Sequence, residues 1–118
     1  MLVASREMKP LLTNQLSAFT QRFSNFTDAE FRSFKLLSPT SMKATFALQD
    51  AGREYDWITL ALEFNDVIDA SLISDEQLHL IDLSQGATLN YNDSFEFSIN
   101  ESTFFIKART LKYQEGTF

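Results

Sequence analysis

Two neighbouring stretches decide the fold: Met42-Lys43-Ala44-Thr45-Phe46-Ala47-Leu48-Gln49 and Trp57-Ile58-Thr59-Leu60-Ala61-Leu62-Glu63-Phe64. Core-type residues occupy every second position in both, as Met, Ala, Phe and Leu in the first and Ile, Leu, Leu and Phe in the second. This two-residue period is typical of strands with one face in a core. Between them, Asp50-Ala51-Gly52-Arg53 has the residues of a tight turn. The stretches therefore predict an antiparallel hairpin.

The chain on either side of this hairpin adds further strand candidates. They are residues 29–36, 67–73, 87–91, 95–99 and 103–113. We expect Asn65-Asp66 to end the second hairpin strand, and Ser74-Asp75-Glu76-Gln77 to open either one helical turn or a further short strand. Because no helix-length pattern separates the candidates, residues 29–113 predict a mostly antiparallel β-sheet, as a meander or a sandwich.

The N-terminal region has a different period. Leu12, Leu16, Phe19 and Phe23 follow one another at steps of four, three and four residues, which is typical of an amphipathic helix. Pro10 is suited to a first helical turn, and Asn25 to a left-handed position after the last one. We therefore predict a helix over about residues 8–23 and an α+β fold of one domain over residues 1–118.

The composition limits the chemistry. The 118 residues include twelve Phe but no Cys and one His, so disulfides and thiolate metal sites are excluded and the core is expected to be aromatic. No phosphate-binding loop or hydrolase motif occurs. We expect no catalytic residues, no metal site and no cofactor, and hence no enzyme. The alternatives are a catalytic His79, an acid–base role for Glu63, and cation binding by one acidic group. That group consists of Asp66, Asp69, Asp75, Glu76 and Asp82.

Charge is distributed unevenly along the chain, whose formal net charge is −6. Residues 54–106 contain eleven acidic residues and no Lys or Arg, whereas all ten basic residues lie outside this segment. In one interpretation the basic ends fold against the acidic segment and neutralise it. In the other, the acidic side chains form one surface that attracts a basic partner. Both interpretations disfavour nucleic acid as a partner.

One aromatic residue in the acidic segment is a candidate binding anchor. Trp57 alternates with the apolar strand positions, which places it on the solvent face unless a helix or a second sheet covers it. An exposed Trp beside carboxylates is typical of protein recognition. The candidate partner-binding residues are Glu54, Asp56, Trp57, Glu63, Asp66, Asp69, Asp75 and Glu76.

Three short segments resemble small bacterial immunity proteins of contact-dependent and polymorphic toxin systems. They are Asn25-Phe26-Thr27-Asp28-Ala29-Glu30-Phe31, with Thr27 at the position of the family's His, Leu62-Glu63-Phe64-Asn65-Asp66-Val67, and Phe105-Ile106-Lys107-Ala108-Arg109-Thr110-Leu111. The resemblance implies a non-enzymatic protein that neutralises a toxin by binding it.

Together, these patterns predict a protein-binding domain with a basic partner, acting as a monomer or homodimer. The alternative function is binding of a small ligand in an aromatic-lined pocket between helix and sheet. No apolar run reaches the length of a membrane span and no secretory signal is recognisable, so we expect a cytoplasmic protein without a membrane partner.

Overall fold

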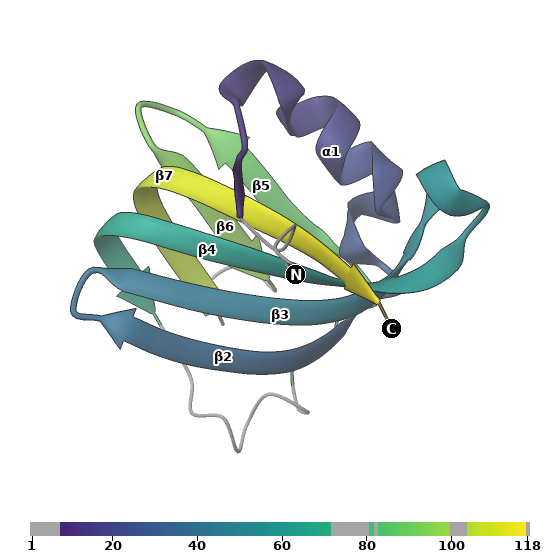
Figure 1. Cartoon of the computed structure of the whole chain (residues 1–118). Coiled ribbons are helices and arrows are strands. Elements are labelled where there is room, and N and C mark those ends of the chain that lie inside the picture. The colour runs from purple at the N-terminus through teal and green to yellow at the C-terminus, as the bar shows by residue number, and fades with distance from the viewer. Residues whose placement is uncertain (1–7, 72–80, 82, 100–103, 118) are drawn as a thin grey trace, which may run out of the picture.

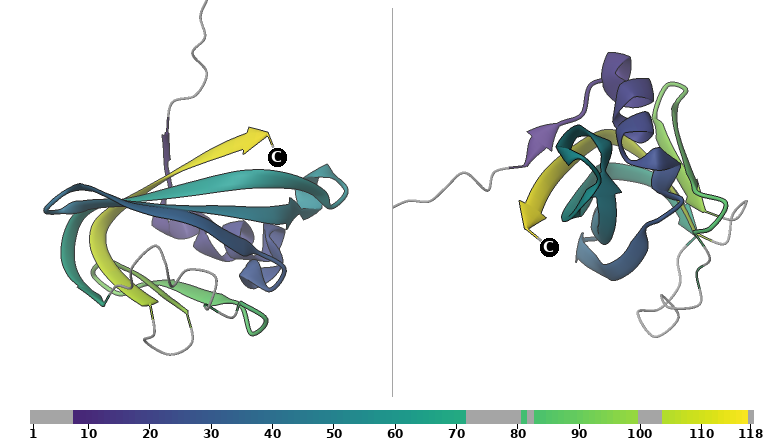
Figure 2. Two further views of the ribbon diagram at one scale, coloured as in Figure 1. Left: turned by 90° about the horizontal axis from the view of Figure 1, so that it is seen from below. Right: turned by 90° about the vertical axis from the view of Figure 1, so that its right-hand side faces the viewer.

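The computed structural model describes residues 8–71, 81, 83–99 and 104–117, and these form mainly one antiparallel sheet (Figure 1). The order of the six longer strands across the sheet is β2-β3-β4-β7-β6-β5. Their bounds are Glu30–Ser38 (β2), Ser41–Asp50 (β3), Asp56–Ser71 (β4), Ala87–Tyr91 (β5), Phe95–Ile99 (β6) and Phe104–Thr117 (β7). The predicted dominance of antiparallel strands is confirmed, and the sheet curves strongly around its core (Figure 2).

The predicted hairpin lies at the centre of the sheet. β3 and β4 pair in register from Ser41 opposite Asn65 to Asp50 opposite Asp56. The alternating Ile, Leu and Phe side chains of β4 are all buried, so Trp57, Thr59, Ala61 and Glu63 lie on the opposite, outer face of the sheet. Packing of the alternate side chains into one core explains why the two-residue period predicted these strands correctly.

The second hairpin strand is longer than the sequence indicated. We expected Asn65-Asp66 to end it, but β4 continues to Ser71 alongside β7. A straight strand of this length would span about 50 Å, whereas the molecule is at most 34 Å across. The strand therefore bends, with Asp66 at a φ of 54° and a register shift against β7 between Val67 and Asp69. Asn65-Asp66 therefore marks a bend within β4 and not the end of the strand.

The prediction of one helix over residues 8–23 is wrong in its first half. Lys9–Pro10 form a short strand, β1, which pairs with β7, and Leu11 N–H donates to the carbonyl oxygen of Leu111 at 2.9 Å. Only Leu16–Arg22 form an α-helix, α1, between the short 3₁₀ turns η1 (Thr13–Gln15) and η2 (Ser24–Phe26). Pairing with a strand about 100 residues away overrides the local spacing signal.

The core between α1 and the sheet is filled with phenylalanine rings. Phe97 lies at its centre, and its ring centroid is 5.7 Å from that of Phe64, 5.9 Å from Phe26 and 6.0 Å from Phe46. All four side chains are fully buried. The rings meet mostly edge to face, which is the favourable geometry for aromatic pairs. The predicted aromatic core is confirmed.

A tight backbone contact fixes the turn that follows α1. Asn25 adopts the predicted left-handed conformation, with a φ of 53°. Gly86, at a φ of +81°, packs so closely on this turn that a Cβ atom there would lie 2.5 Å from the Asn25 carbonyl oxygen. Only glycine fits this position. Within the described ranges, no helix is long and apolar enough to cross a membrane.

Candidate functional site

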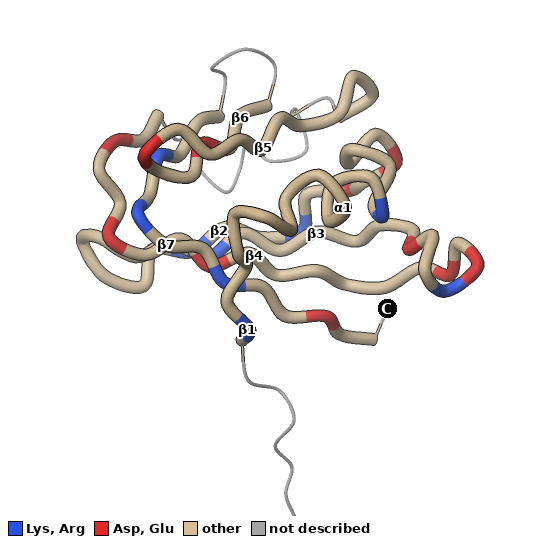
Figure 3. The backbone as a smooth tube through the Cα atoms, turned by 90° about the horizontal axis from the view of Figure 1, so that it is seen from above, with Lys and Arg blue, Asp and Glu red and all other residues tan. Residues whose placement is uncertain are grey.

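The sheet separates the predicted partner-binding residues. Glu54, Asp56 and Trp57 lie at the end of the β3–β4 hairpin, Glu63 lies in the middle of β4, and Asp66 and Asp69 lie at and beyond its bend. Asp75 and Glu76, as well as His79 and Asp82, lie outside the described residues. Figure 3 shows acidic and basic segments of the backbone near one another, at the hairpin as well as on the opposite side of the molecule. The hairpin end therefore brings together three of the eight predicted residues, Glu54, Asp56 and Trp57.

This end, residues 51–57, is called the hairpin tip. It comprises the 3₁₀ turn η3 (Ala51–Arg53), then Glu54 and Tyr55 in left-handed conformation with φ of 57° and 66°. The Tyr55 N–H donates to the Asp50 carbonyl oxygen at 2.8 Å, and Gln49 Nε2 donates to the Tyr55 carbonyl oxygen at 3.2 Å. These hydrogen bonds close the turn and direct its side chains outward.

The hairpin tip exposes two aromatic side chains and two carboxylates that alternate along the chain. Tyr55 is 58% exposed and Trp57 is 39% exposed, and Glu54 and Asp56 beside them are exposed as well. Of the two arrangements considered for Trp57, the structure has the solvent-facing one. Tyr55 was not among the predicted residues, because its position in a turn gives no periodic signal.

Four charged residues anchor the hairpin tip to the rest of the protein. Arg22, at the end of α1, donates from Nε and Nη2 to the two carboxylate oxygens of Asp50 at 2.7 and 2.6 Å. The same guanidinium donates from Nη1 and Nη2 to Glu115 of β7, at 3.0 Å each. Arg53 completes the group, with Nη2 2.8 Å from Glu115 Oε1 and Nε 3.3 Å from Asp50 Oδ2. This ion cluster links α1, β3, β7 and the hairpin tip.

The electrostatics of the ion cluster follow from its hydrogen bonds. The Asp50 side chain is fully buried, and its hydrogen bonds from Arg22 hold its pKa below the usual value in spite of burial. Hydrogen bonds from Arg22 likewise lower the pKa of Glu115, and the bond to Asp50 raises the pKa of Arg22. Gly52 N–H adds a further bond to Asp50 Oδ1 at 2.8 Å. Both carboxylates are therefore ionised and occupied, which makes them supports and not acid–base groups.

Little in the local sequence indicates this cluster. Its central residue, Arg22, is 28 residues from Asp50 and 93 from Glu115. The only local signal is the Asp50-Ala51-Gly52 turn, where an Asp side chain is typically bonded to the backbone two residues later.

Glu63 faces the outer surface of the sheet between two lysines. It is paired with Lys43 of β3 on one side and with Lys112 of β7 on the other. Asn65 Nδ2 donates to its Oε2 at 3.2 Å. The alternative of a core-facing acid–base carboxyl group at Glu63 is therefore wrong, because strand alternation directs this side chain away from the core.

The acidic residues beyond the bend also face a lysine. Asp69 of β4 and Glu96 of β6 are both register partners of Lys107, which lies between them on β7. Lys107 Nζ is 3.8 Å from Glu96 Oε2. Strand pairing therefore places lysines of the basic ends opposite Glu63, Asp69 and Glu96, in line with the interpretation in which the basic ends fold against the acidic segment. In the described part of the chain, no group of three His, Asp or Glu residues is placed to hold a metal ion.

Comparisons of the chain with protein-family models, with curated proteins and with solved structures find no match. The functional argument therefore rests on the geometry of the hairpin tip.

Proposed function

We propose that the chain is a non-enzymatic protein-binding domain that contacts its partner through the hairpin tip. The observation that supports this most is the exposure of Tyr55 and Trp57, two residues apart in a hairpin tip that is held by ion pairs to the buried Asp50 side chain. Aromatic side chains dominate the binding energy of many interfaces, and a preformed turn loses little conformational entropy on binding. The tip therefore combines an anchor with a rigid support.

The charges of the hairpin tip favour a basic partner. Its exposed carboxylates are Glu54 and Asp56, while the nearby Arg22 and Arg53 are bound to Asp50 and Glu115. A basic protein would be attracted by the two exposed carboxylates and would bury the two rings. An inhibitor of a basic toxin, as in the resemblance to immunity proteins, is the form of this function that we propose.

The test is affinity capture from the native host with three immobilised proteins: the wild type, Trp57→Ala, and the control Leu37→Ala. Leu37 is 48% exposed on β2, so its truncation removes an exposed apolar side chain away from the tip. A protein captured through the tip is retained by wild type and Leu37→Ala, and its affinity for Trp57→Ala falls by about 2 kcal/mol or more. Its association rate decreases as salt is raised.

Two results would count against this proposal. One is a partner that binds wild type and Trp57→Ala equally well, since the tip would then not be the contact surface. The other is an association rate that does not change with salt, which would remove the role of Glu54 and Asp56. A circular dichroism spectrum of Trp57→Ala identical to that of wild type establishes that lost binding does not reflect lost folding.

A further inference from the structure

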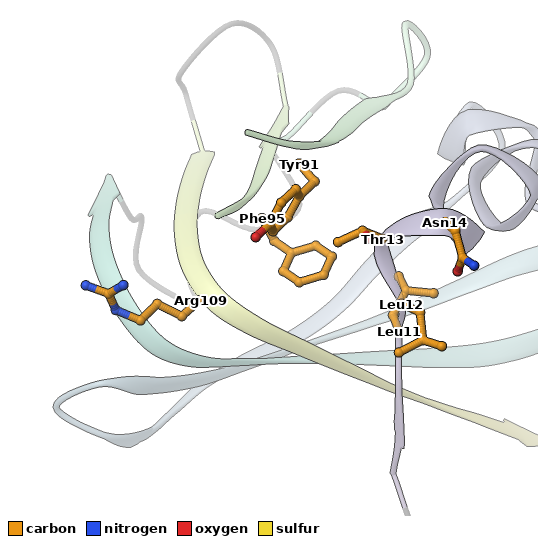
Figure 4. Close-up of a pocket in the computed structure, with 7 residues that line it drawn as sticks. All are labelled: Leu11, Leu12, Thr13, Asn14, Tyr91, Phe95 and Arg109. Atoms are coloured by element: carbon orange, nitrogen blue, oxygen red, sulfur yellow. The ribbon is translucent and has the colours of Figure 1, made fainter. Parts of the chain in front are cut away.

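A second surface lies at the other end of α1, where two adjoining hollows of about 470 and 480 Å³ open beside β5. They share Thr13 and Tyr91. The first lies between residues 11–14 and the ring pair of Tyr91 and Phe95 (Figure 4). The centroids of these two rings are 5.1 Å apart. The second separates Ser17 of α1 from β5. Together they form one channel, called the β5 groove.

One wall of the β5 groove is the last strand of the sheet. β5 pairs with β6 along one edge, and within the described residues no strand pairs with its other edge. Unpaired edges of sheets are usually protected by charges, prolines or bulges. β2, at the opposite end, has such protection, because Arg32 lies at a register shift and is flanked by Glu30. Residues 87–91 contain no charge, no proline and no register shift.

The side chains around the β5 groove suit a neutral, extended ligand. Hydroxyl and amide groups, which donate as well as accept hydrogen bonds, come from both walls: Thr13, Asn14, Ser17, Thr20 and Asn90. Leu12 and Tyr91 at the rim are 52% and 46% exposed. The lining contains no carboxylate, and the guanidinium of its one charged residue, Arg109, points away from the ring pair (Figure 4).

We propose that the β5 groove binds an extended, uncharged peptide segment of a partner protein. The segment adds a strand to the free edge of β5, its main chain bonding to that edge. An apolar side chain of the segment packs between Leu12 and the ring pair of Tyr91 and Phe95. This surface goes beyond the proposed function, because it lies at the opposite end of α1 from the ion cluster and takes a neutral segment instead of a basic surface.

A phage-displayed library of random nonapeptides, selected on the folded protein, provides the probe. Peptides that bind wild type are then measured against Ser17→Arg, which places a long side chain in the groove, and against Ala18→Arg, its exposed neighbour outside the lining. We expect affinity for Ser17→Arg to fall at least about tenfold and affinity for Ala18→Arg to stay within about twofold.

Strand addition itself is tested with N-methylated versions of the best peptide. Only every second N–H of an added strand points toward β5, so methylation is expected to abolish binding at alternate residues and to be tolerated between them. The proposal is overturned if the library yields no binding peptide, if Ser17→Arg binds like wild type, or if methylation has no alternating effect. A Trp57→Ala protein that still binds the peptide separates this surface from the hairpin tip.

Discussion

The two ends of β4 hold acidic residues in opposite ways. At its start, Asp56 is paired with another acid, Asp50, and the buried Asp50 is neutralised by Arg22 from α1 and Arg53 from the turn. Toward its end, Asp69 is the register partner of Lys107 on the neighbouring strand β7. The sheet thus gives the acidic residues at the two ends of β4 different surroundings. We call the start of β4, next to the ion cluster, the braced end, and the part beyond Asp66, opposite Lys107, the compensated end.

This difference is the basis for placing the proposed binding surface at the hairpin tip. Beyond the bend Lys107 is the register partner of both Asp69 and Glu96 and offsets part of their negative charge. At the braced end the arginines are turned inward to Asp50 and Glu115, which leaves Glu54 and Asp56 exposed next to two rings. Burying an ion pair is costly and serves mainly to fix one geometry, so the ion cluster is best understood as a positioning device for the hairpin tip.

The sharpest way to break the comparison is to remove one acid from each end. Asp50→Ala leaves two arginines without their buried partner, and we expect the free energy of unfolding to fall by about 3 kcal/mol. Asp69→Ala removes an exposed carboxylate and should change it by less than about 1 kcal/mol. Urea denaturation measures both. Equal losses for the two variants would show that the ends do not differ.

Acid should destabilise the protein through Asp50 and Glu115 of the ion cluster. The pKa values of Asp50 and Glu115 are lower in the folded protein than in the unfolded chain, so the unfolded chain binds more protons as the pH falls. The stability from these groups is complete above the ordinary carboxyl pKa of about 4 and is lost as the pH falls through the lowered values. Arg22→Met, which removes the cause of the lowering, should flatten this decline in urea denaturation between pH 6 and 2. An unchanged slope would contradict it.

The smallest expected effect concerns the middle of β4. Glu63→Gln removes one negative charge between Lys43 and Lys112 but keeps the side-chain length and an oxygen for Asn65. Cross-strand charge pairs contribute roughly 0.2–1 kcal/mol each, so a loss below about 1 kcal/mol is expected. The measurement is thermal unfolding. A loss of stability as large as that of Asp50→Ala would mean that Glu63 makes a stabilising interaction that the structure does not show.

Sequence periodicity predicted the strands whose side chains face one core. β3 and β4 follow directly from their alternation, and β5, β6 and β7 from shorter versions of it. The N-terminal helix was predicted too long because the spacing from Leu12 to Phe23 is helical, whereas pairing of Pro10 with Lys112 is invisible to local patterns. The continuation of β4 through Asp66 was missed for the same reason, since β7 holds the strand together across the bend.

The candidate site was predictable only where it lies on a strand. Alternation placed Trp57 on the outer face, and the structure confirms its exposure. The supports of the hairpin tip were not predictable, because Arg22, Asp50 and Glu115 meet only after α1, β3 and β7 have packed.

The most direct test of the hairpin tip uses Trp57, the only tryptophan of the chain. Its fluorescence is quenched with caesium, a cation, and with iodide, an anion, and compared with N-acetyltryptophanamide. Because the exposed carboxylates Asp56 and Glu54 precede Trp57 in the hairpin tip, caesium should quench more strongly than iodide relative to that standard, and Glu54→Gln with Asp56→Asn should abolish the preference. A tryptophan that neither ion reaches, or one that iodide quenches better, would contradict an exposed aromatic anchor near the carboxylates of the hairpin tip.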